Sequence, residues 1–563
     1  AVSPPRDIDP HSAKQLSQIS TEAVRRVRAE IWPSLVTPND VHDALVTGGF
    51  LTSPELSGAQ SSLNTLRDQR RADEINVTEH APSIWVAAER INLFSAIHPG
   101  LRARVLPPRG YDEALEPTQA LERLVRSRLQ LVGPTTASML AKPLGLAPTQ
   151  VLQTLTKLQA EGFVFAGRFD ASVPTDEQQW CERRLLARMH RYAMAERRRS
   201  VRPVTASLFM RFLFRWHGFD GPIPTGDQRL FDVLQQLEAF GAPAGNWETD
   251  LLNRRVPHYE PGGLDALCLS GRIGWLRLRA TDAHGGGGLL NATPIGFSAR
   301  RRLRDWRTIA DDVELSSDAA TLRAALEDGP VFLSDLLDDT GLLPAQIERG
   351  LSELARHGLA TSDSFSGLRA LLPRKSGRPR MSARAARRRS SDELEAAGRW
   401  SLVTRPGTPR EDHVEYAATV LLRRYGIVFR ALLDREAAMP AWSELRTAFR
   451  QMESAGEVRG GRFVSGFAGE QFASAEAIKV LNALKRQTPT GRRIGISAAD
   501  PLNLIGIILP GEKVPSSSKA TLWFQDGLPR EDGNSNHNNG SVGVGPQTVG
   551  RPRFAGFVRS RTT

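Results

Sequence analysis

The sequence predicts a mainly α-helical chain with small β wings, of the α+β class: tandem winged helix-turn-helix modules followed by the start of a strand-rich, β-barrel-like unit. Three observations predict this fold. A helical pattern ending in glycine recurs along the chain, and a short strand-like run follows three of its copies. The chain also has 563 residues, whereas a single hydrophobic core rarely grows past about 250–300 residues.

The repeated pattern places apolar residues four and then three positions apart, followed by a glycine four positions later. This spacing marks one face of a helix, and glycine suits the left-handed position at a helix end. A helix capped in this way and followed by a hairpin is how a winged helix-turn-helix finishes. The copies are Val151-Leu155-Leu158-Gly162, Leu230-Leu234-Leu237-Gly241, Ile347-Leu351-Leu354-Gly358 and Leu445-Phe449-Met452-Gly456, with a degraded fifth at Leu264-Leu267-Gly271.

Turn signals and shifts in composition divide the chain into eight segments. Near the start, Thr37 and Pro38 open a helix, because proline suits the first helical turn. The segments are a first winged-helix-like module at 1–100, a second winged helix at 101–180, a larger helical unit with a glycine-rich connector at 181–310, a winged helix at 311–373, a basic linker at 374–397, a winged helix at 398–480, an incomplete strand-rich segment at 481–525 and a disordered tail at 526–563.

The module at 398–480 can be followed in full. Helices are expected at 414–425, 431–436 and 443–454, with an extended stretch at 427–429. Gly460-Gly461 lies between two strand-like runs, which is a strong signal for a two-residue hairpin turn. We therefore expect Arg459 and Arg462 at the tip of the wing. Arg446 and Arg450 are one helical turn apart, off the apolar face of the third helix.

The charge of the chain favours a polyanionic partner. It has 74 Lys and Arg against 62 Asp and Glu, a net charge of +12, and most of the cations are arginine. In helix-turn-helix proteins the third helix enters the major groove, and wing arginines suit phosphate contact. We expect DNA as the partner, with Arg446, Arg450, Arg459, Arg462 and, after the strand of the second module, Arg168 as contacts. Solvated surface or protein contact is the alternative role of these arginines.

Nothing in the sequence indicates a metal site, a membrane span or secretion. Cys181 and Cys268 lack metal-type spacing and are expected in the core. No apolar run approaches the roughly 18 residues of a membrane helix, and the start lacks a secretory signal. The glycine-rich loop at 283–288 lacks the Lys-Ser/Thr of a phosphate-binding loop, so it is expected to be a connector. The expected location is the reducing cytoplasm, with no membrane contact.

Five short motifs follow one another in the last third of the chain, before Gly506. They are Gly398-Arg399-Trp400-Ser401-Leu402, Leu421-Leu422-Arg423-Arg424-Tyr425-Gly426-Ile427-Val428, Gly460-Gly461-Arg462-Phe463-Val464-Ser465-Gly466-Phe467, Gly469-Glu470-Gln471-Phe472-Ala473 and Ser497-Ala498-Ala499-Asp500-Pro501-Leu502-Asn503. These motifs resemble the C-terminal region of the large helicase-related proteins, the Lhr family of bacterial superfamily 2 DNA helicases. Weaker similarity extends back to about residue 20.

The resemblance implies the extension of a DNA-repair helicase, made of tandem winged helices and a β-barrel and similar to winged-helix DNA glycosylases of the AlkZ-like type. The motifs of an ATP-driven motor do not occur in the sequence. We therefore expect no cofactor in this chain, with ATP and Mg²⁺ held by the family's helicase core in the same or an adjacent polypeptide. Self-association into a homo-oligomer stays open. The family pattern stops near Asp526, which suggests a truncated, frameshifted or diverged end.

Two functions of different classes fit this resemblance. The first is a DNA-binding extension without chemistry of its own. The second is a DNA glycosylase, in which a carboxylate or amide positions water against the sugar of a flipped nucleotide. Asp500, Glu470 and Gln471 are the weak catalytic candidates by chemistry. Each also suits a structural role, because Asp500 precedes Pro501 as a turn or cap residue does, and the other two could close the wing.

Overall fold

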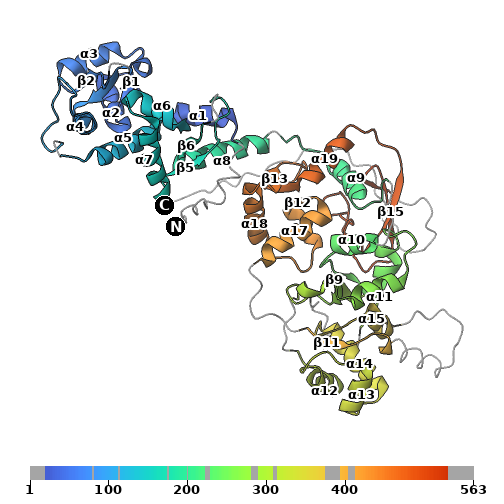
Figure 1. Ribbon diagram of the computed structural model, residues 1–563. Helices are drawn as coiled ribbons and strands as arrows, with labels where there is room; N and C mark the ends of the chain where they lie inside the picture. The colour runs from blue at the N-terminus through green and yellow to red at the C-terminus, as the bar shows by residue number, and fades with distance from the viewer. Residues whose placement is uncertain are drawn as a thin grey trace, which may run out of the picture.

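The computed structural model describes residues 19–78, 81–111, 114–173, 177–199, 201–221, 228–279, 289–307, 313–373, 394–403 and 412–530. Within these ranges, helices alternate with small antiparallel sheets, which confirms the predicted class. Figure 1 shows a smaller N-terminal lobe in blue and teal and a longer lobe from green to red, joined by α8 (Arg183–Arg199). Of the basic linker predicted at 374–397, residues 374–393 lie outside the described residues, as do the connector at 283–288 and the predicted tail from 531 onward. Leu394 and Ala397, at the end of the predicted linker, are buried in the core of the third and fourth modules.

The first module has a sheet in the order β1–β3–β2. Its second helix, α2, begins as predicted, since the Thr37 hydroxyl accepts from the Asp40 N–H at 3.2 Å and the Asp40 carboxylate accepts from the Thr37 N–H at 2.9 Å. The third helix ends near Arg70, which is left-handed at φ 58° in place of a glycine. The sequence pattern required a glycine at this position, so it did not identify α3 as a third helix. The elements are α1 (Thr21–Ile31), α2 (Pro38–Gly48), β1 (Leu51–Thr52), α3 (Gln60–Asp68), β2 (Ala72–Ile75), β3 (Ile84–Ala87) and α4 (Ile91–Ile97).

The second module repeats this plan with the sheet order β4–β6–β5. Its third helix, α7, buries Val151, Leu155 and Leu158, the three apolar positions of the pattern. Cys181 is buried in the third strand of the module, β6, as expected. The elements before α8 are α5 (Pro117–Val132), β4 (Thr135–Thr136), α6 (Ala137–Ala141), α7 (Pro148–Ala160), β5 (Val164–Gly167) and β6 (Gln179–Glu182).

In the third module the structure reassigns one copy of the pattern. Leu230 and Leu234 lie in α10, ahead of the first strand, and Ala239 at φ 58° takes the left-handed conformation there. The degraded fifth copy supplies the third helix, α11, in a sheet module of order β7–β9–β8. The elements are α9 (Ala206–Trp216), α10 (Gln228–Gln236), β7 (Ala242–Pro243), the π-helix Trp247–Leu252, α11 (Pro261–Leu269), β8 (Ile273–Leu276) and β9 (Pro294–Ala299).

The fourth module uses a strand from beyond the basic linker. Trp400–Leu402 forms β11, which pairs antiparallel with β10 and also bridges to Val331. We expected this stretch in the next module, so the boundary predicted at 398 falls inside the fourth module's sheet. The elements are α12 (Ser317–Ala325), α13 (Leu333–Thr340), α14 (Pro344–Arg356), β10 (Ala360–Ser362), α15 (Phe365–Leu371) and β11.

The fifth module confirms the three helices expected in it, with a sheet in the order β12–β14–β13. Leu445, Phe449 and Met452 of α18 are buried as predicted. The elements are α17 (His413–Tyr425), β12 (Ile427–Phe429), a 3-10 helix (Arg430–Arg435), α18 (Trp442–Ser454), β13 (Val458–Gly461), β14 (Gln471–Ser474) and α19 (Ala475–Lys485).

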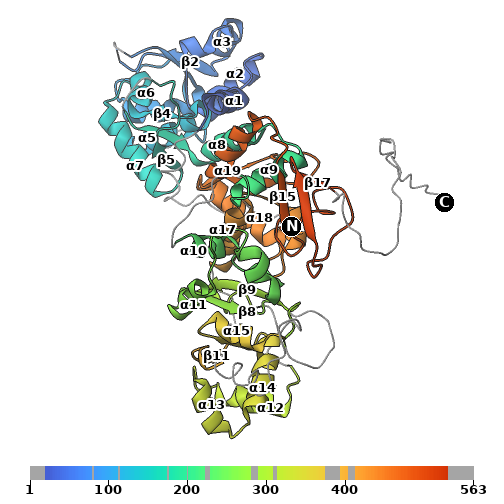
Figure 2. The same ribbon diagram turned by 90° about the vertical axis from the view of Figure 1, so that its right-hand side faces the viewer.

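The chain then forms a separate antiparallel sheet in the order β15–β16–β17, beside α9 in both Figure 1 and Figure 2. The strands are β15 (Arg493–Ser497), β16 (Thr521–Gln525) and β17 (Leu528–Arg530). Within the described residues this sheet has three strands and does not close into a barrel. We expected a disordered tail from residue 526, but β17 shows that regular structure continues to Arg530.

Continuous packing joins the modules of the longer lobe. One core unites α9 with the fifth module and with Phe524 of the final sheet, and another unites α10 and α11 with the fourth module. Third helices α7, α11, α14 and α18 are followed by left-handed Gly162, Gly271, Gly358 and Gly456, with φ of 71°, 71°, 64° and 80°. The helix-end prediction is confirmed at these four positions.

Candidate nucleic-acid interface

The third helices of the modules differ in whether they are free to enter a DNA groove. In the third module, α11 is docked on α15 of the fourth module. The Asp265 carboxylate accepts from Arg369 Nη1 at 2.8 Å, from the Ser364 hydroxyl at 2.8 Å and from the Ser366 N–H at 2.9 Å. This helix therefore connects two modules and is covered on the side that holds Asp265.

In three other modules, cations of the third helix are already paired. Arg67 of α3 bonds Glu74 at 3.1 Å, and its guanidinium lies 4.5 Å from the centroid of the Trp85 ring. Lys157 of α7 bonds Glu122 at 2.7 Å. Arg349 of α14 lies 3.3 Å from Asp318. Such surface pairs contribute little to stability, but each one partly neutralises the positive charge that DNA would meet.

The third helix of the fifth module, α18, has an exposed arginine without such a partner. Arg446 is exposed and, within the described part of the chain, forms no ion pair. Arg450, one turn later, bonds the Glu470 carboxylate at 2.7 Å. Burial raises the pKa of Glu470, but Arg450 and Arg198 outweigh it and hold the pKa below its usual range. Arg446 and Arg450, which we predicted together as DNA contacts, therefore differ: Arg450 is paired with a carboxylate, and Arg446 is not paired with one among the described residues.

The predicted turn of the wing is wrong. Gly460 and Gly461 lie within β13 and pair with Phe472 and Gln471 of β14, so residues 462–470 form the connection. A Cβ atom on Gly460 would lie 2.5 Å from Glu453 Oε1 and 2.8 Å from Arg198 Nε. A Cβ atom on Gly461 would lie 2.8 Å from Val201, so the end of α8 and Val201 beyond it pack closely against this strand. The turn rule considers only the two strands of a hairpin and does not register these neighbours.

Arg459 consequently does not lie at a wing tip. Its Nη2 donates to the Arg197 carbonyl at 3.0 Å, near the end of α8, where carbonyls lack helical partners. Arg198 pairs with both Glu453 and Glu470. Farther along, the Val204 N–H donates to the Phe463 carbonyl at 2.7 Å, and the Ser465 N–H donates to the Val204 carbonyl at 2.8 Å. The segment leaving α8 is thus fastened to the wing.

Arg462 and Arg168 occupy equivalent places in two modules, and both are exposed. The tripeptides Gly461-Arg462-Phe463 and Gly167-Arg168-Phe169 each begin at the last residue of the second strand in their module, and each is held by a glutamine of the module's third strand. Gln471 Oε1 accepts from the Phe463 and Val464 N–H groups at 2.8 Å each, and its Nε2 donates to the Val464 carbonyl at 2.8 Å. Gln471 therefore closes the wing.

Gln179 makes the same three bonds in the second module. Its Oε1 accepts from the Phe169 and Asp170 N–H groups at 2.9 and 2.8 Å, and its Nε2 donates to the Asp170 carbonyl at 2.9 Å. We did not predict this device, although the identical Gly-Arg-Phe tripeptides in the sequence are a signal for it. The glutamine bonds fix the backbone next to Arg168 in the second module and next to Arg462 in the fifth, so the two arginines emerge at the same place in their modules.

Asp500 is buried in a network that joins the final sheet region to the third module. Its oxygens accept from Arg255 Nη1 and Nη2 at 2.8 and 2.9 Å, and the Leu502 N–H donates to Oδ1 at 3.0 Å. Although burial raises the pKa of Asp500, Arg255 lowers it further, so the net shift is downward. The carboxylate is fully buried and held by an arginine and a turn.

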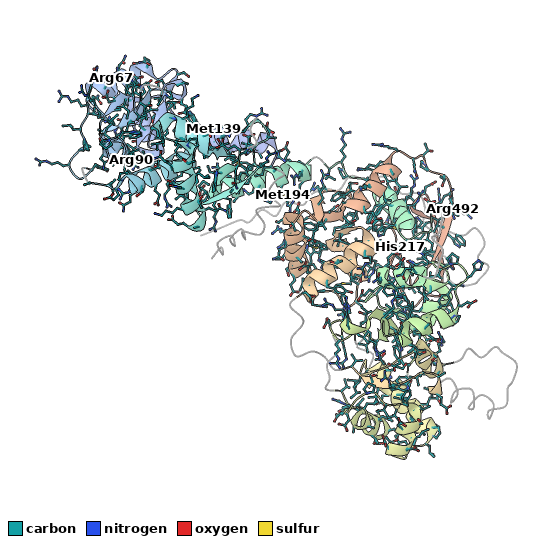
Figure 3. The ribbon with its side chains drawn as sticks, viewed as in Figure 1. Arg67, Arg90, Met139, Met194, His217 and Arg492 are labelled. Atoms are coloured by element: carbon teal, nitrogen blue, oxygen red, sulfur yellow. The ribbon has the colours of Figure 1, made fainter. Side chains whose placement is uncertain are left out.

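His217, labelled in Figure 3 inside the longer lobe, borders this ion pair. Its Nε2 donates to the Arg424 carbonyl at 2.8 Å, and Nδ1 faces Arg255 Nη2 at 3.3 Å. Burial and the positive charge of Arg255 lower the pKa of His217 to about 3. A neutral imidazole with its proton on Nε2 fits both contacts.

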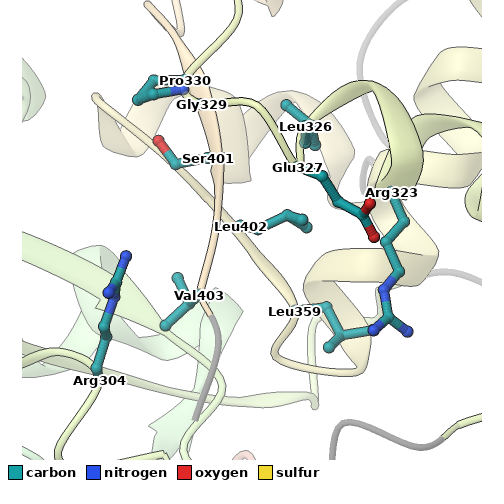
Figure 4. Close-up of a pocket in the computed structure, with 10 residues that line it drawn as sticks. All are labelled: Arg304, Arg323, Leu326, Glu327, Gly329, Pro330, Leu359, Ser401, Leu402 and Val403. Carbon is teal, nitrogen blue, oxygen red and sulfur yellow. The ribbon is translucent and has the colours of Figure 1, made fainter. Parts of the chain in front are cut away.

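A cavity of about 260 Å³ in the fourth module, shown in Figure 4, has no grouping suited to catalysis. Arg304 and Arg323 lie on opposite sides of it, Glu327 lies beside Arg323, and apolar residues such as Leu402 separate them. Among the described residues, no cluster of three or more His, Cys, Asp or Glu side chains is arranged to hold a metal ion. No described helix is both long and apolar enough to cross a bilayer.

Comparison with known proteins matches two of these modules to one family. Residues 204–291 and 407–493 match the third and fourth winged-helix domains of the large helicase-related protein. The Lhr helicase and probable uracil glycosylase of Mycolicibacterium smegmatis is 27% identical over 472 residues, which are 79% of this chain and 30% of that protein. The Lhr helicase and uracil glycosylase of Escherichia coli is 27% identical over 422 residues, 68% of this chain and 26% of that protein.

The chain thus spans less than a third of the length of either relative. The matched segments coincide with the third and fifth modules, whose helices and three-stranded sheets are those of winged helices. Both relatives bear the Lhr name and align with most of the chain. The chain is therefore a C-terminal Lhr-like region.

Proposed function

We propose that this chain is the DNA-binding region of an Lhr-type repair helicase and that the fifth module supplies its main groove contact. The observation that supports this most directly is α18, a third helix with an exposed arginine, Arg446, that forms no ion pair within the described residues. Arg462 projects from the wing of the same module and is likewise exposed. By contrast, α11 is docked on a neighbouring module through Asp265.

The contacts would be mainly to phosphate and largely independent of sequence. On α18 the Thr447 hydroxyl donates to the Ser443 carbonyl at 3.0 Å, and the Ser454 hydroxyl donates to the Arg450 carbonyl at 2.9 Å. These two hydroxyls are bonded within the helix, and the exposed arginine side chains are its positively charged groups. Phosphate contacts position a protein on DNA without distinguishing bases.

The test is DNA affinity as a function of salt for an Arg446→Ala/Arg462→Ala variant. For the unaltered chain, affinity should fall roughly a thousandfold between about 50 and 200 mM salt if six phosphates are contacted. The variant should bind more weakly on all sequences, and its salt slope should be flatter by about 0.9 for each phosphate that it no longer neutralises.

Arg349→Ala is the matched control, because Arg349 is 73% exposed on the third helix of another module. It should leave affinity and slope unchanged. Unchanged affinity of the Arg446→Ala/Arg462→Ala variant, with an unaltered melting temperature, would remove Arg446 and Arg462 as DNA contacts.

The second candidate is uracil excision, supported by the glycosylase names of both relatives. We assign no catalytic residue, because Asp500 is paired with Arg255, Glu470 with Arg450 and Arg198, and Gln471 with the wing backbone. Incubation with uracil-containing single-stranded and duplex oligonucleotides, followed by alkaline cleavage, tests the activity. Absence of cleavage at enzyme excess would leave DNA binding alone.

The expected partner besides DNA is an Lhr-type helicase core, in the same or an adjacent polypeptide. We propose that this region itself holds no cofactor, that ATP and Mg²⁺ belong to that core, and that the protein acts in the cytoplasm. Whether the region forms a homo-oligomer is tested by its molar mass in solution with and without DNA.

A further inference from the structure

A groove of about 380 Å³ lies where the segment after α8, the wing of the fifth module and the last turns of α19 meet. Its floor is apolar, with Phe463 and Leu481 only 2% and 1% exposed. Four cations line it, namely Arg202, Arg459, Lys485 and Arg486. Among the described residues that line the groove, none is a carboxylate.

The cations of the groove are held in place by contacts of their own. Lys485 Nζ donates to the Arg202 carbonyl at 2.8 Å, and Arg459 Nη2 donates to the Arg197 carbonyl at 3.0 Å. Partial burial and the positive charge of Arg202 both lower the pKa of Lys485. Lys485 and Arg202 are therefore close enough for their positive charges to repel one another, and a bound anion would relieve that repulsion.

A second hollow continues the positive surface on the other side of Val201, which lines both. Arg198, Arg199 and Arg462 line this second hollow, with Glu470 as the acidic residue among them. The cations therefore extend from the wing of the fifth module, past Val201 and Arg202, to the end of α19. A surface of this kind follows a chain of phosphates better than it encloses one small anion.

We propose that the groove binds the phosphodiester backbone of a nucleic-acid strand, as a second contact beyond α18 and without reading bases. The proposal rests on the DNA-binding function proposed above. The floor supports it, because Phe463 is buried and offers no exposed ring for base stacking, while apolar side chains accommodate sugar. Asn482 is the only amide among the described lining residues, too little to distinguish bases.

The experiment compares Lys485→Ala/Arg486→Ala with Lys479→Ala in the full chain, by fluorescence anisotropy on single-stranded and duplex oligonucleotides. Lys479 is an exposed lysine of the same helix that does not line the groove. The groove variant should bind about tenfold more weakly, and the slope of log affinity against log salt should flatten by about 1.4–1.8 if two phosphates are no longer neutralised. The Lys479→Ala control should match the unaltered chain.

The outcomes separate this proposal from the proposed function. If Arg446→Ala, at a residue that lines neither hollow, weakens binding and the groove variant does not, the groove proposal is overturned and the α18 contact stands. If only the groove variant does, the groove stands and the α18 assignment fails. Inorganic phosphate that binds tightly to the unaltered chain, with the DNA affinity of the groove variant unchanged, would identify a free-anion site instead and overturn the proposal. Matching melting temperatures exclude misfolding as the cause.

Discussion

Replacing Asp500 with Asn should destabilise the longer lobe, because it leaves the Arg255 guanidinium buried without a counter-charge. Arg255 and Asp500 are joined by two hydrogen bonds of 2.8 and 2.9 Å, and their side chains are 0% and 1% exposed. Asparagine keeps the shape but loses the negative charge and one acceptor. Removing one member of such a pair costs about 3–5 kcal/mol, whereas replacing both by apolar residues is often close to neutral.

The assay is urea denaturation of Asp500→Asn, followed by tryptophan fluorescence. Asp434→Asn is the control. In the pair of Arg430 with Asp434, the arginine side chain is 60% exposed and the aspartate side chain 46%, so the pair should contribute no more than about 1 kcal/mol. A double variant, Arg255→Met/Asp500→Leu, should recover most of the lost stability. Full stability of Asp500→Asn together with loss of uracil excision would refute this reasoning and favour a catalytic Asp500.

Three further predictions follow from the same contacts. Gln471→Ala should lower the free energy of unfolding by at least about 2 kcal/mol, since two buried N–H groups lose their acceptor; a loss below about 0.5 kcal/mol in urea denaturation would contradict this. The folded-state pKa of His217 is depressed from 6.5 to about 3, so the unfolded chain binds the extra proton, and stability present above pH 6.5 is lost as pH falls. Between pH 6.5 and 5.5 the unaltered chain should lose about 1 kcal/mol more than a His217→Gln variant, measured by urea denaturation at each pH. The chain alone should hydrolyse no ATP with or without DNA, and DNA-stimulated release of phosphate from a pure preparation would count against the assignment of ATP to a separate core.

Local sequence patterns were sufficient for the fifth module's helices. The period of Leu445, Phe449 and Met452 matches a helix with one buried face, and α18 has that face. The same period occurs at Leu230 and Leu234, where it belongs to a first helix and not to the third helix of its module. The spacing of apolar residues indicates that one face of a helix is buried, but it does not indicate which other element covers that face.

The wing shows where local rules failed. Gly460-Gly461 has the composition of a tight turn, but both residues are paired in a strand, and Arg198 and Val201 pack closely against them. These neighbours are more than 250 residues away in sequence. Turn propensity is set by the backbone of a few adjacent residues, so it does not register an approach from another part of the chain.

By itself the sequence determined the class of the modules, the positions of most helices, the excess of positive charge and the motifs shared with the Lhr family. Only the tertiary structure decided which of the arginines predicted as contacts are bonded to other groups of the protein. Arg450 and Arg459 were predicted together with Arg446 and Arg462, but the first pairs with Glu470 and the second bonds the carbonyl of Arg197. The physical reason is that side-chain type and helical position set where an arginine emerges, whereas its partner is whatever charge the fold brings within a few ångströms.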